Sequence, residues 1–340
     1  MLNIGLIGLG FMGKTHLENY LRLEREGAPV RVVALCDVDA AKLNGEGGGG
    51  NIETSSEHAI DYGRFSKYTS VEEMLNNEKL DIVDITLPTF LHRDVTIQCL
   101  NSGVHVLCEK PMAMNAAECD DMVAAAEANG KQLLIGQCLR FWPAYVYLQE
   151  LVESGRFGSA TSAHFYRGGG TPSWGPWVLV KEKGGGALLD MHVHDTDTVN
   201  WLFGKPEAVS SIGRNVIPGS GYDIVSTQYR YADGKVVSSH VDWTLNGDFG
   251  FEMGYKINFE RGNLQFDGSR VKVNPNDGAG FFAELAEDQG YYYQIKAFVE
   301  AVAGDRPIEA ATPASTKASI EIVTAERESA DQRGAWVLVP

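Results

Sequence analysis

The 340-residue sequence predicts an α/β fold in two parts: a doubly wound parallel sheet over residues 1–135, then an α+β domain over residues 136–340. Two observations carry this prediction. Up to about residue 135, short, continuously apolar runs alternate with segments of helical periodicity, as in sheets covered by helices on both faces. Beyond residue 140, strands with alternating polar and apolar residues follow, separated by turn signals, which is typical of antiparallel sheets. The chain is long enough for two hydrophobic cores.

The apolar runs of the first part predict five parallel strands. They are Leu2–Ile7, Val30–Cys36, Ile82–Thr86, Val104–Cys108 and Gln132–Ile135. The helices predicted between them are Met12–Glu24, Val71–Asn76, Arg93–Ser102 and Ala116–Asn129. The stretch Asn44–Glu57 is rich in glycine, serine and acidic residues and predicts a flexible surface loop or insertion.

The second part begins with helical periodicity and continues with strands. The predicted helices are Phe141–Glu153, Leu188–Phe203, Tyr291–Ala303 and Pro313–Gln332. The predicted strands are Tyr222–Tyr231, Lys235–Thr244, Gly254–Glu260 and Asn263–Asp267. The breaks Ala232-Asp233-Gly234 and Arg261-Gly262 are hairpin turn signals, so we expect neighbouring strands to pair antiparallel.

Composition excludes several classes of partner. There are 45 acidic and 29 basic residues, a net charge of −16, and no basic run, so nucleic acids and anionic membranes are poor partners. No apolar run is long enough for a membrane span, and the first residues lack the pattern of a signal peptide. The five cysteines are dispersed and form no zinc-type pair, so we expect reduced thiols in a cytoplasmic protein.

The run Gly8-Leu9-Gly10-Phe11-Met12-Gly13 matches the dinucleotide-binding motif GxGxxG, and it lies between an apolar strand and a helix as that motif requires. Glycines there permit a tight turn and a close approach of backbone to pyrophosphate, whose charge the helix N-terminus stabilises. Asp37, at the end of the second strand, is placed to bind the adenosine ribose hydroxyls. A carboxylate there repels a 2′-phosphate and no arginine follows it, so we expect NAD, with NADP less favoured.

Two further stretches carry candidate chemistry. Lys110, in Glu109-Lys110-Pro111, ends an apolar strand, where a lysine is costly unless it faces a cleft. Asp190, His194 and Asp197 have the spacing of one helix face, so a carboxylate there can orient an imidazole that acts as a base. Alternatives remain: acids that only complement the helix dipole, a metal site involving His192 and His194, or a structural histidine at 192.

These features together resemble the Gfo/Idh/MocA family of oxidoreductases over nearly the whole chain. The motifs that carry the resemblance are Gly8–Gly13 followed by His16, Asp37 in Leu-Cys-Asp-Val, Thr86–His92, Glu109-Lys110-Pro111, Arg140–Pro143, and Gly185–Asp190 with His194. The resemblance implies a Rossmann domain, a second domain with a large open sheet that commonly builds dimers or tetramers, a nicotinamide cofactor, and sugar or polyol substrates. One departure is His192, where many members have a small residue.

The resemblance also assigns roles to residues. The catalytic residues would be Lys110, Asp190 and His194. The cofactor would be bound by Gly8, Gly10, Phe11, Met12, Gly13, Asp37, Thr86, Pro88, His92, Glu109 and Lys110. The substrate candidates are Gln137, Arg140, Arg167, Trp174 and His192. No metal is expected.

We therefore expect an NAD-dependent dehydrogenase that oxidises a secondary hydroxyl of a sugar or cyclitol. In one version His194 takes the hydroxyl proton while Lys110 stabilises the alkoxide; in the other Lys110 is itself the base. A redox-neutral enzyme that transforms a sugar or glycoside with tightly bound NAD would use the same residues. A non-enzymatic, NAD-bound regulator would be free to lose them.

Overall fold

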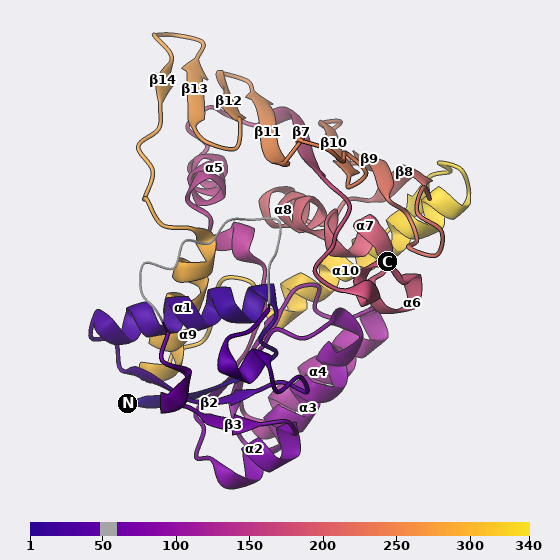
Figure 1. The fold of residues 1–340 in the computed structure, drawn as a ribbon. Helices are drawn as coiled ribbons and strands as arrows, with labels where there is room; N and C mark the ends of the chain where they lie inside the picture. Colours follow the sequence, from indigo (N-terminus) through magenta and orange to yellow (C-terminus); the bar gives the residue numbers. More distant parts are fainter. Residues whose placement is uncertain (48–59) are drawn as a thin grey trace. The chain divides into compact units, whose positions relative to one another are not determined.

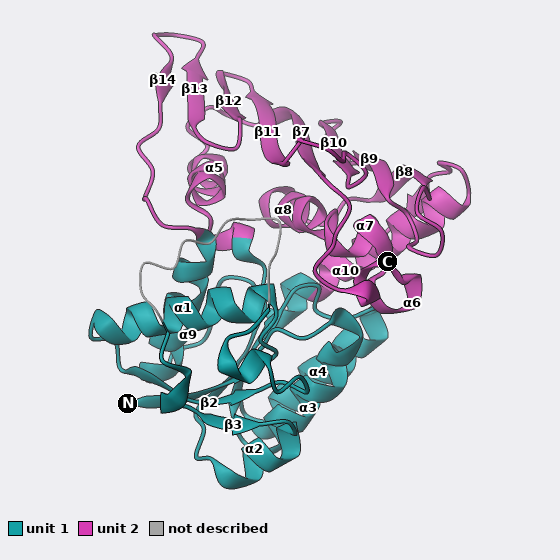
Figure 2. Ribbon diagram, in the orientation of Figure 1, with its two compact units in different colours: residues 1–138, 290–316 teal, residues 139–289, 317–340 magenta. Residues whose placement is uncertain are grey.

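The computed structural model describes residues 1–47 and 60–340, which form two compact units (Figure 2). Unit 1 contains Met1–Cys138 and Gly290–Thr316, and unit 2 contains Leu139–Gln289 and Lys317–Pro340. The first division falls three residues after the predicted boundary at 135, but the chain returns to unit 1 at residue 290. Most of the predicted loop Asn44–Glu57 lies outside the described residues.

Unit 1 is built on a six-stranded parallel sheet with the strand order β3-β2-β1-β4-β5-β6. Its strands are β1 (Leu2–Ile7), β2 (Val30–Cys36), β3 (Ser66–Tyr68), β4 (Ile82–Ile85), β5 (His105–Glu109) and β6 (Leu133–Gly136). Its helices are α1 (Phe11–Arg25), α2 (Val71–Asn77), α3 (His92–Asn101), α4 (Ala116–Asn129) and α9 (Gly290–Ala303), with short 3₁₀ turns at Lys42–Asn44, Tyr62–Arg64 and Thr89–Leu91. The predicted doubly wound parallel sheet is confirmed, and the short edge strand β3 was not predicted.

Helix α9 joins unit 1 because its aromatic face packs on α1. The Tyr292 hydroxyl donates to the Glu26 carboxylate over 2.5 Å. The Arg22 guanidinium lies 4.2 Å from the centre of the Tyr292 ring, at a distance where a cation is attracted by an aromatic face. These side chains lie some 270 positions apart in the sequence, so no local pattern could reveal that this helix returns to the first unit.

Unit 2 contains a nine-stranded sheet with the order β14-β13-β12-β11-β7-β10-β9-β8-β15. Its strands are β7 (Ala160–Gly169), β8 (Ala208–Arg214), β9 (Ile224–Arg230), β10 (Val236–Asp242), β11 (Phe251–Phe259), β12 (Gly262–Phe266), β13 (Val271–Pro275), β14 (Phe281–Phe282) and β15 (Val337–Leu338). Only β7 and β10 pair parallel among these described strands, so the predicted mostly antiparallel sheet is confirmed. The long strand β7 was missed.

Helices cover one face of this sheet (Figure 1). They are α5 (Pro143–Ser154), α6 (Lys181–Gly184), α7 (Gly186–Asp190), α8 (Val193–Phe203) and α10 (Pro313–Asp331), with 3₁₀ turns at Cys138–Phe141 and Pro176–Leu179. On the covered face, Tyr145 of α5 packs edge-on against Tyr255 of β11, and the Tyr255 hydroxyl donates to the Ala144 carbonyl. Along each strand, alternate side chains point to the other face and into solvent. In β10, for example, Val236 is exposed and Val237 is buried.

The single helix predicted over Leu188–Phe203 is wrong. The chain forms two helices, α7 and α8, separated by Met191 and His192. The His192 N–H donates to the Ala187 carbonyl, five residues back, over 2.7 Å, which widens the turn. The His192 side chain is fully buried on the sheet, so tertiary contacts override the local helical pattern. Asp190 therefore ends one helix and His194 belongs to the next.

Candidate functional site

The glycine loop connects β1 to α1 at the carboxyl edge of the parallel sheet. A side chain at Gly13 would place its Cβ 1.9 Å from the Gly8 carbonyl oxygen, so only glycine fits, whereas a Cβ at Gly10 would meet no atom within 4 Å. Gly10 is the N-cap of α1, and no side chain caps this end of the helix. Its first N–H groups can therefore bind an anionic group. Phe11 and Met12 form the first turn of α1. The cradle fits a dinucleotide pyrophosphate.

Asp37 follows β2 beside this loop and is 6% exposed. One carboxylate oxygen accepts the Leu9 N–H over 2.7 Å and the other accepts the Asp39 N–H over 2.9 Å. Each oxygen keeps a second lone pair for a ribose hydroxyl. The Lys42 ammonium lies 3.8 Å from the carboxylate, so the acid has a cationic neighbour that the sequence analysis did not identify.

Thr86 and His92 form hydrogen bonds that hold together the loops at the carboxyl edge of the sheet. The Thr86 hydroxyl donates to the Gly8 carbonyl over 2.7 Å. His92, which is buried, contacts the Pro111 carbonyl through Nδ1 and the Leu87 carbonyl through Nε2. Burial lowers the pKa of His92, although both carbonyls favour the charged ring. Both ring nitrogens thus have protein partners. Pro88 precedes the 3₁₀ turn at Thr89–Leu91.

Lys110 follows β5 and is half-buried at the same edge. Its backbone N–H donates to one oxygen of the buried Glu109 carboxylate over 3.1 Å. At the end of β6, next to β5, Gln137 is 1% exposed, and its side-chain nitrogen has no hydrogen-bond partner among the described residues. A buried amide nitrogen of this kind is a candidate ligand contact. Unit 1 thus presents Lys110, Gln137 and the glycine loop at the carboxyl ends of its strands, where ligands bind in such sheets.

In unit 2, Asp190 and His194 lie on either side of the break between α7 and α8. Both are half-buried, whereas His192, Val193 and the residues from Asp195 to Val199 are buried. Met191 between them is half-buried as well, so Asp190 and His194 belong to a partly exposed stretch between packed helices. Asp197 does not share a surface with them, because it is 1% exposed and paired with Arg140.

The polar substrate candidates of unit 2 have protein partners. Arg140 binds Asp197 through two hydrogen bonds of 2.7 and 2.8 Å. Arg167 binds Asp195 over 3.1 and 3.3 Å, and burial raises the pKa of Asp195 against the attraction of that arginine.

The remaining candidates differ in exposure. His192 is fully buried and contacts the hydroxyls of Thr227 and Ser239, each over 3.1 Å. Burial, with His240 and Arg167 nearby, lowers the pKa of His192 to about 3, so the ring is neutral. This is the setting of a structural histidine. Trp174 is half-buried in the segment between β7 and α6.

Sequence reasoning missed two buried polar networks. In unit 1, His16 lies between Asp84 and Glu109. In unit 2, Glu326 accepts hydrogen bonds from Thr196 and Tyr229. An acid within the apolar strand around Asp84 was the available signal, because a buried carboxylate needs a partner.

The described residues hold no group of three or more His, Cys, Asp or Glu side chains that could bind a metal ion. Across residues 1–47 and 60–340, no helix combines the length and apolar character needed to cross a membrane. All five cysteines are buried and free of disulfides.

Comparison with known structures supports this fold over the full chain. Levoglucosan dehydrogenase in complex with NADH and levoglucosan superposes with a TM-score of 0.83 at 23% identity, covering 100% of this chain and 99% of that one. An oxidoreductase from Agrobacterium radiobacter in complex with NAD⁺, L-tartaric acid and magnesium gives 0.81 at 18% identity, covering 99% and 98%. At these identities the likeness establishes the fold alone.

Curated relatives match over part of their length. Inositol 2-dehydrogenase from Salmonella typhimurium is 28% identical over 60% of this chain and 55% of its own length. The chain thus spans about half the length of this relative. The 2,7-anhydro-N-acetylneuraminate hydratase of Escherichia coli is 27% identical over 78% of this chain and 68% of its own length.

Two domain models cover most of the sequence. Residues 2–137 match the oxidoreductase family model with an NAD-binding Rossmann fold, and residues 145–265 match the C-terminal domain of the same family. The two matches follow one another in the order that the two units have in the structure. The chain is therefore a member of the Gfo/Idh/MocA family of oxidoreductases, with an NAD-binding Rossmann domain.

Proposed function

We propose that this protein is an NAD-dependent dehydrogenase that oxidises a secondary hydroxyl of a sugar or cyclitol. The observation that carries the proposal is the placement of Lys110, half-buried at the carboxyl edge of the sheet that also bears the glycine loop. A lysine held there can act on a ligand bound beside the loop. The family match and the relatives named inositol 2-dehydrogenase support the substrate class.

In the proposed chemistry, two side chains, His194 and Lys110, act on the same substrate hydroxyl. His194 takes the hydroxyl proton, and Asp190 orients the ring and stabilises its positive charge. The Lys110 ammonium hydrogen-bonds the same oxygen and stabilises the developing alkoxide. Bound NAD supplies the hydride acceptor. The partial exposure of Asp190 and His194, between the buried residues 184–189 and 195–199, supports their assignment. In the alternative arrangement, neutral Lys110 is the base and His194 is a hydrogen-bond partner.

The test is NADH formation, followed at 340 nm, with a panel of inositols, aldoses, sugar acids and glycosides, each with NAD and with NADP. We expect turnover of one substrate class with NAD, and its loss in Lys110→Ala and His194→Ala. Asp39→Asn, at an exposed position beside the cofactor acid, is the control and should keep the activity. A panel without turnover, from protein saturated with NAD, would contradict the dehydrogenase proposal.

A redox-neutral reaction is the second candidate, and the relatives named 2,7-anhydro-N-acetylneuraminate hydratase favour it. Such a reaction needs the same acid–base residues but no exchange of cofactor, so the cofactor would stay bound between turnovers. NAD that co-purifies through gel filtration, together with sugar conversion and no net NADH, would favour this candidate. Rapid loss of NAD on gel filtration would count against it.

We also propose that the chain forms a homo-dimer or homo-tetramer through the uncovered face of the nine-stranded sheet. This face exposes large apolar side chains: Ile212 is 67% exposed, Val236 61% and Leu338 71%. The exposed edge and face of a sheet are costly to leave in water. Light scattering after gel filtration should give a mass of two or four chains, and Val236→Asp should lower it. A monomer in the wild type would refute the proposal.

A cytoplasmic location is proposed from the cysteines. None of the five forms a disulfide, although thiols in oxidising compartments commonly do. Alkylation of protein extracted from its source cells, followed by mass measurement, should label five thiols. A disulfide-linked mass would contradict the location.

A further inference from the structure

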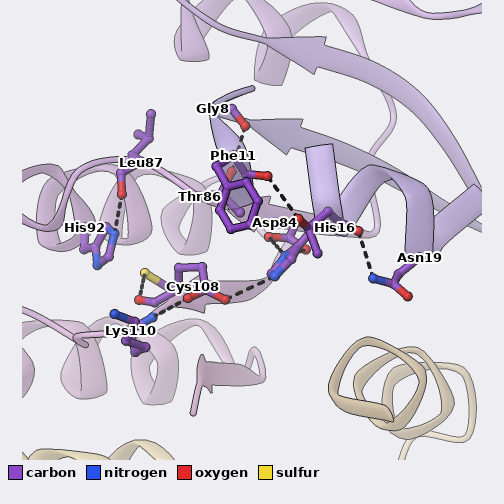
Figure 3. A network of polar contacts seen from close by, with 12 residues as sticks. Gly8, Phe11, His16, Asn19, Asp84, Thr86, Leu87, His92, Cys108 and Lys110 are labelled. Carbon is purple, nitrogen blue, oxygen red and sulfur yellow. Dashed lines mark hydrogen bonds and ion pairs between the residues drawn. The ribbon is translucent and has the colours of Figure 1, made fainter. Parts of the chain in front are cut away.

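The His16 ring lies between two carboxylates beneath the carboxyl edge of the parallel sheet (Figure 3). Its Nδ1 lies 2.9 and 3.1 Å from the two oxygens of Asp84, and its Nε2 lies 3.1 Å from Oε1 of Glu109. His16 and Asp84 are fully buried and Glu109 is 4% exposed. The three side chains come from α1, β4 and β5, so the imidazole connects the helix after the glycine loop to both strands.

This histidine carries a positive charge. Burial alone lowers its pKa, but the charge and hydrogen bond of Asp84, with those of Glu109, outweigh burial and raise the pKa of His16 to about 10. Among the described residues, the Tyr291 ring of α9 lies 6.3 Å from the His16 ring, and the Tyr20 hydroxyl of α1 interacts with Asp84. Neither tyrosine is a cation, and the imidazolium forms an ion pair with each of the two acids.

Glu109 connects His16 to Lys110, the residue that follows it in the chain. While Oε1 faces the imidazolium, Oε2 accepts the backbone N–H of Lys110 over 3.1 Å. The neighbouring strand leaves room for this carboxylate only because residue 136 is glycine: a Cβ there would lie 2.6 Å from Oε1. One carboxylate oxygen is thus paired with the His16 imidazolium, and the other accepts the backbone N–H of Lys110.

We propose that His16 is a positioning residue for Lys110: held by Asp84, its imidazolium fixes the Glu109 carboxylate, which in turn fixes the backbone of Lys110. The inference rests on the proposed role of Lys110 in the reaction. His16 touches neither substrate nor cofactor in this account. Its charge also offsets the negative charge of Glu109 beside Lys110.

The first test measures Lys110 directly and needs no substrate. Protein as purified is labelled with trace acetic anhydride at about pH 8, and mass spectrometry compares Lys110 with Lys79, which is exposed. In His16→Gln the cation is lost, so the remaining negative charge stabilises the Lys110 ammonium and its relative reactivity should fall at least twofold. In Glu109→Gln a negative charge is lost, so the reactivity should rise at least twofold. His105→Gln, at the opposite end of β5, is the control and should change neither.

These opposite signs keep the test decisive when one variant folds poorly. Loss of order would expose Lys110 in both variants and raise its reactivity in both. An unchanged or increased ratio in folded His16→Gln overturns the inference, and so does an unchanged or decreased ratio in Glu109→Gln. If His16→Gln does not fold, Glu109→Gln carries the test alone, because it keeps the contact between His16 and Asp84.

Spectroscopy and kinetics complete the test. Long-range ¹H–¹⁵N spectra of histidine-labelled protein should show His16 protonated on both nitrogens at about pH 8, and a neutral ring would overturn the inference. With the substrate found in the panel, each single variant should lower kcat at least tenfold with KM within threefold, and the double variant should lose no more than the worse single. Additive losses would overturn the inference. If no panel substrate is turned over while labelling and spectra agree, the proposed function fails and the His16 contact stands.

Discussion

Glu326 gives a prediction whose size follows from the structure. The carboxyl lies on α10 and is fully buried in unit 2. It accepts hydrogen bonds from the Thr196 hydroxyl over 2.9 Å and from the Tyr229 hydroxyl over 2.8 Å. Burial raises its pKa from the ordinary 4.5 to about 8, against these two hydrogen bonds and with a contribution from Asp195. Near neutral pH the group is therefore mostly protonated, and its 3.7 Å contact with neutral His192 is not an ion pair.

A carboxyl that binds its proton more tightly in the folded state destabilises the protein once pH exceeds the unfolded pKa. The unfolded chain releases the proton near pH 4.5 and the folded chain only near pH 8, so stability falls with rising pH across this window. Each pH unit within it costs about 1.4 kcal/mol. Between about pH 5.5 and 7.5 the wild type should lose about 3 kcal/mol through this group. Glu326→Gln keeps the shape and an acceptor oxygen but has no proton to lose.

The assay is urea unfolding at the two pH values, followed by tryptophan fluorescence. All six tryptophans lie in unit 2, so this signal reports on the unit that holds Glu326. The free energy of unfolding of Glu326→Gln should fall less than that of the wild type between the two pH values, by about 3 kcal/mol. Glu328→Gln, at an exposed position on the same helix, should follow the wild type. Equal pH dependence in Glu326→Gln and wild type would refute the reasoning.

Two further predictions concern the cofactor loop. Gly13→Ala should lower the melting temperature and abolish NAD binding, because its Cβ would meet a backbone oxygen at 1.9 Å. Gly10→Ala has room for its Cβ and should keep the melting temperature, but it should bind NAD at least tenfold more weakly. Calorimetry with an NAD titration checks both, and wild-type affinity in Gly10→Ala would contradict the assignment of the loop. Asp37→Ser should raise the ratio of kcat/KM for NADP to that for NAD at least tenfold, because like charges about 4 Å apart repel by about 4 kcal/mol at an effective dielectric constant of 20. Exposed Asp39→Ser is its control, and an unchanged ratio in Asp37→Ser would contradict the role of this acid.

The first unit was the easier to predict because its strands are buried on both faces. Leu2–Ile7 and Val30–Cys36 match the structure at both ends, since continuous apolar runs bounded by polar residues leave little choice of register. The missed strand Ala160–Gly169 has one exposed face, and it contains polar residues and ends in glycines. Such a segment shows weak strand signals until its neighbours are known.

The parts of the candidate site that the sequence predicted are those that lie in short local motifs. The glycine loop, Asp37 and Lys110 each stand in a short pattern with a physical reason. The partner of His16 could not be found in this way, because Asp84 lies 68 positions away along the chain. The break before His194 was also hidden, since the periodicity of the segment is helical and the cause is the burial of His192 on the sheet.

The most direct test of the central claim is transfer of hydrogen from the substrate carbon to the cofactor. The best substrate of the panel, deuterated at the carbon that bears the oxidised hydroxyl, is incubated with the protein and NAD, and the cofactor is analysed by mass spectrometry. The account predicts singly deuterated NADH from the wild type and none above background from Lys110→Ala or His194→Ala. Oxidised sugar with no deuterium in the cofactor, or full transfer in the Lys110→Ala variant, would contradict it.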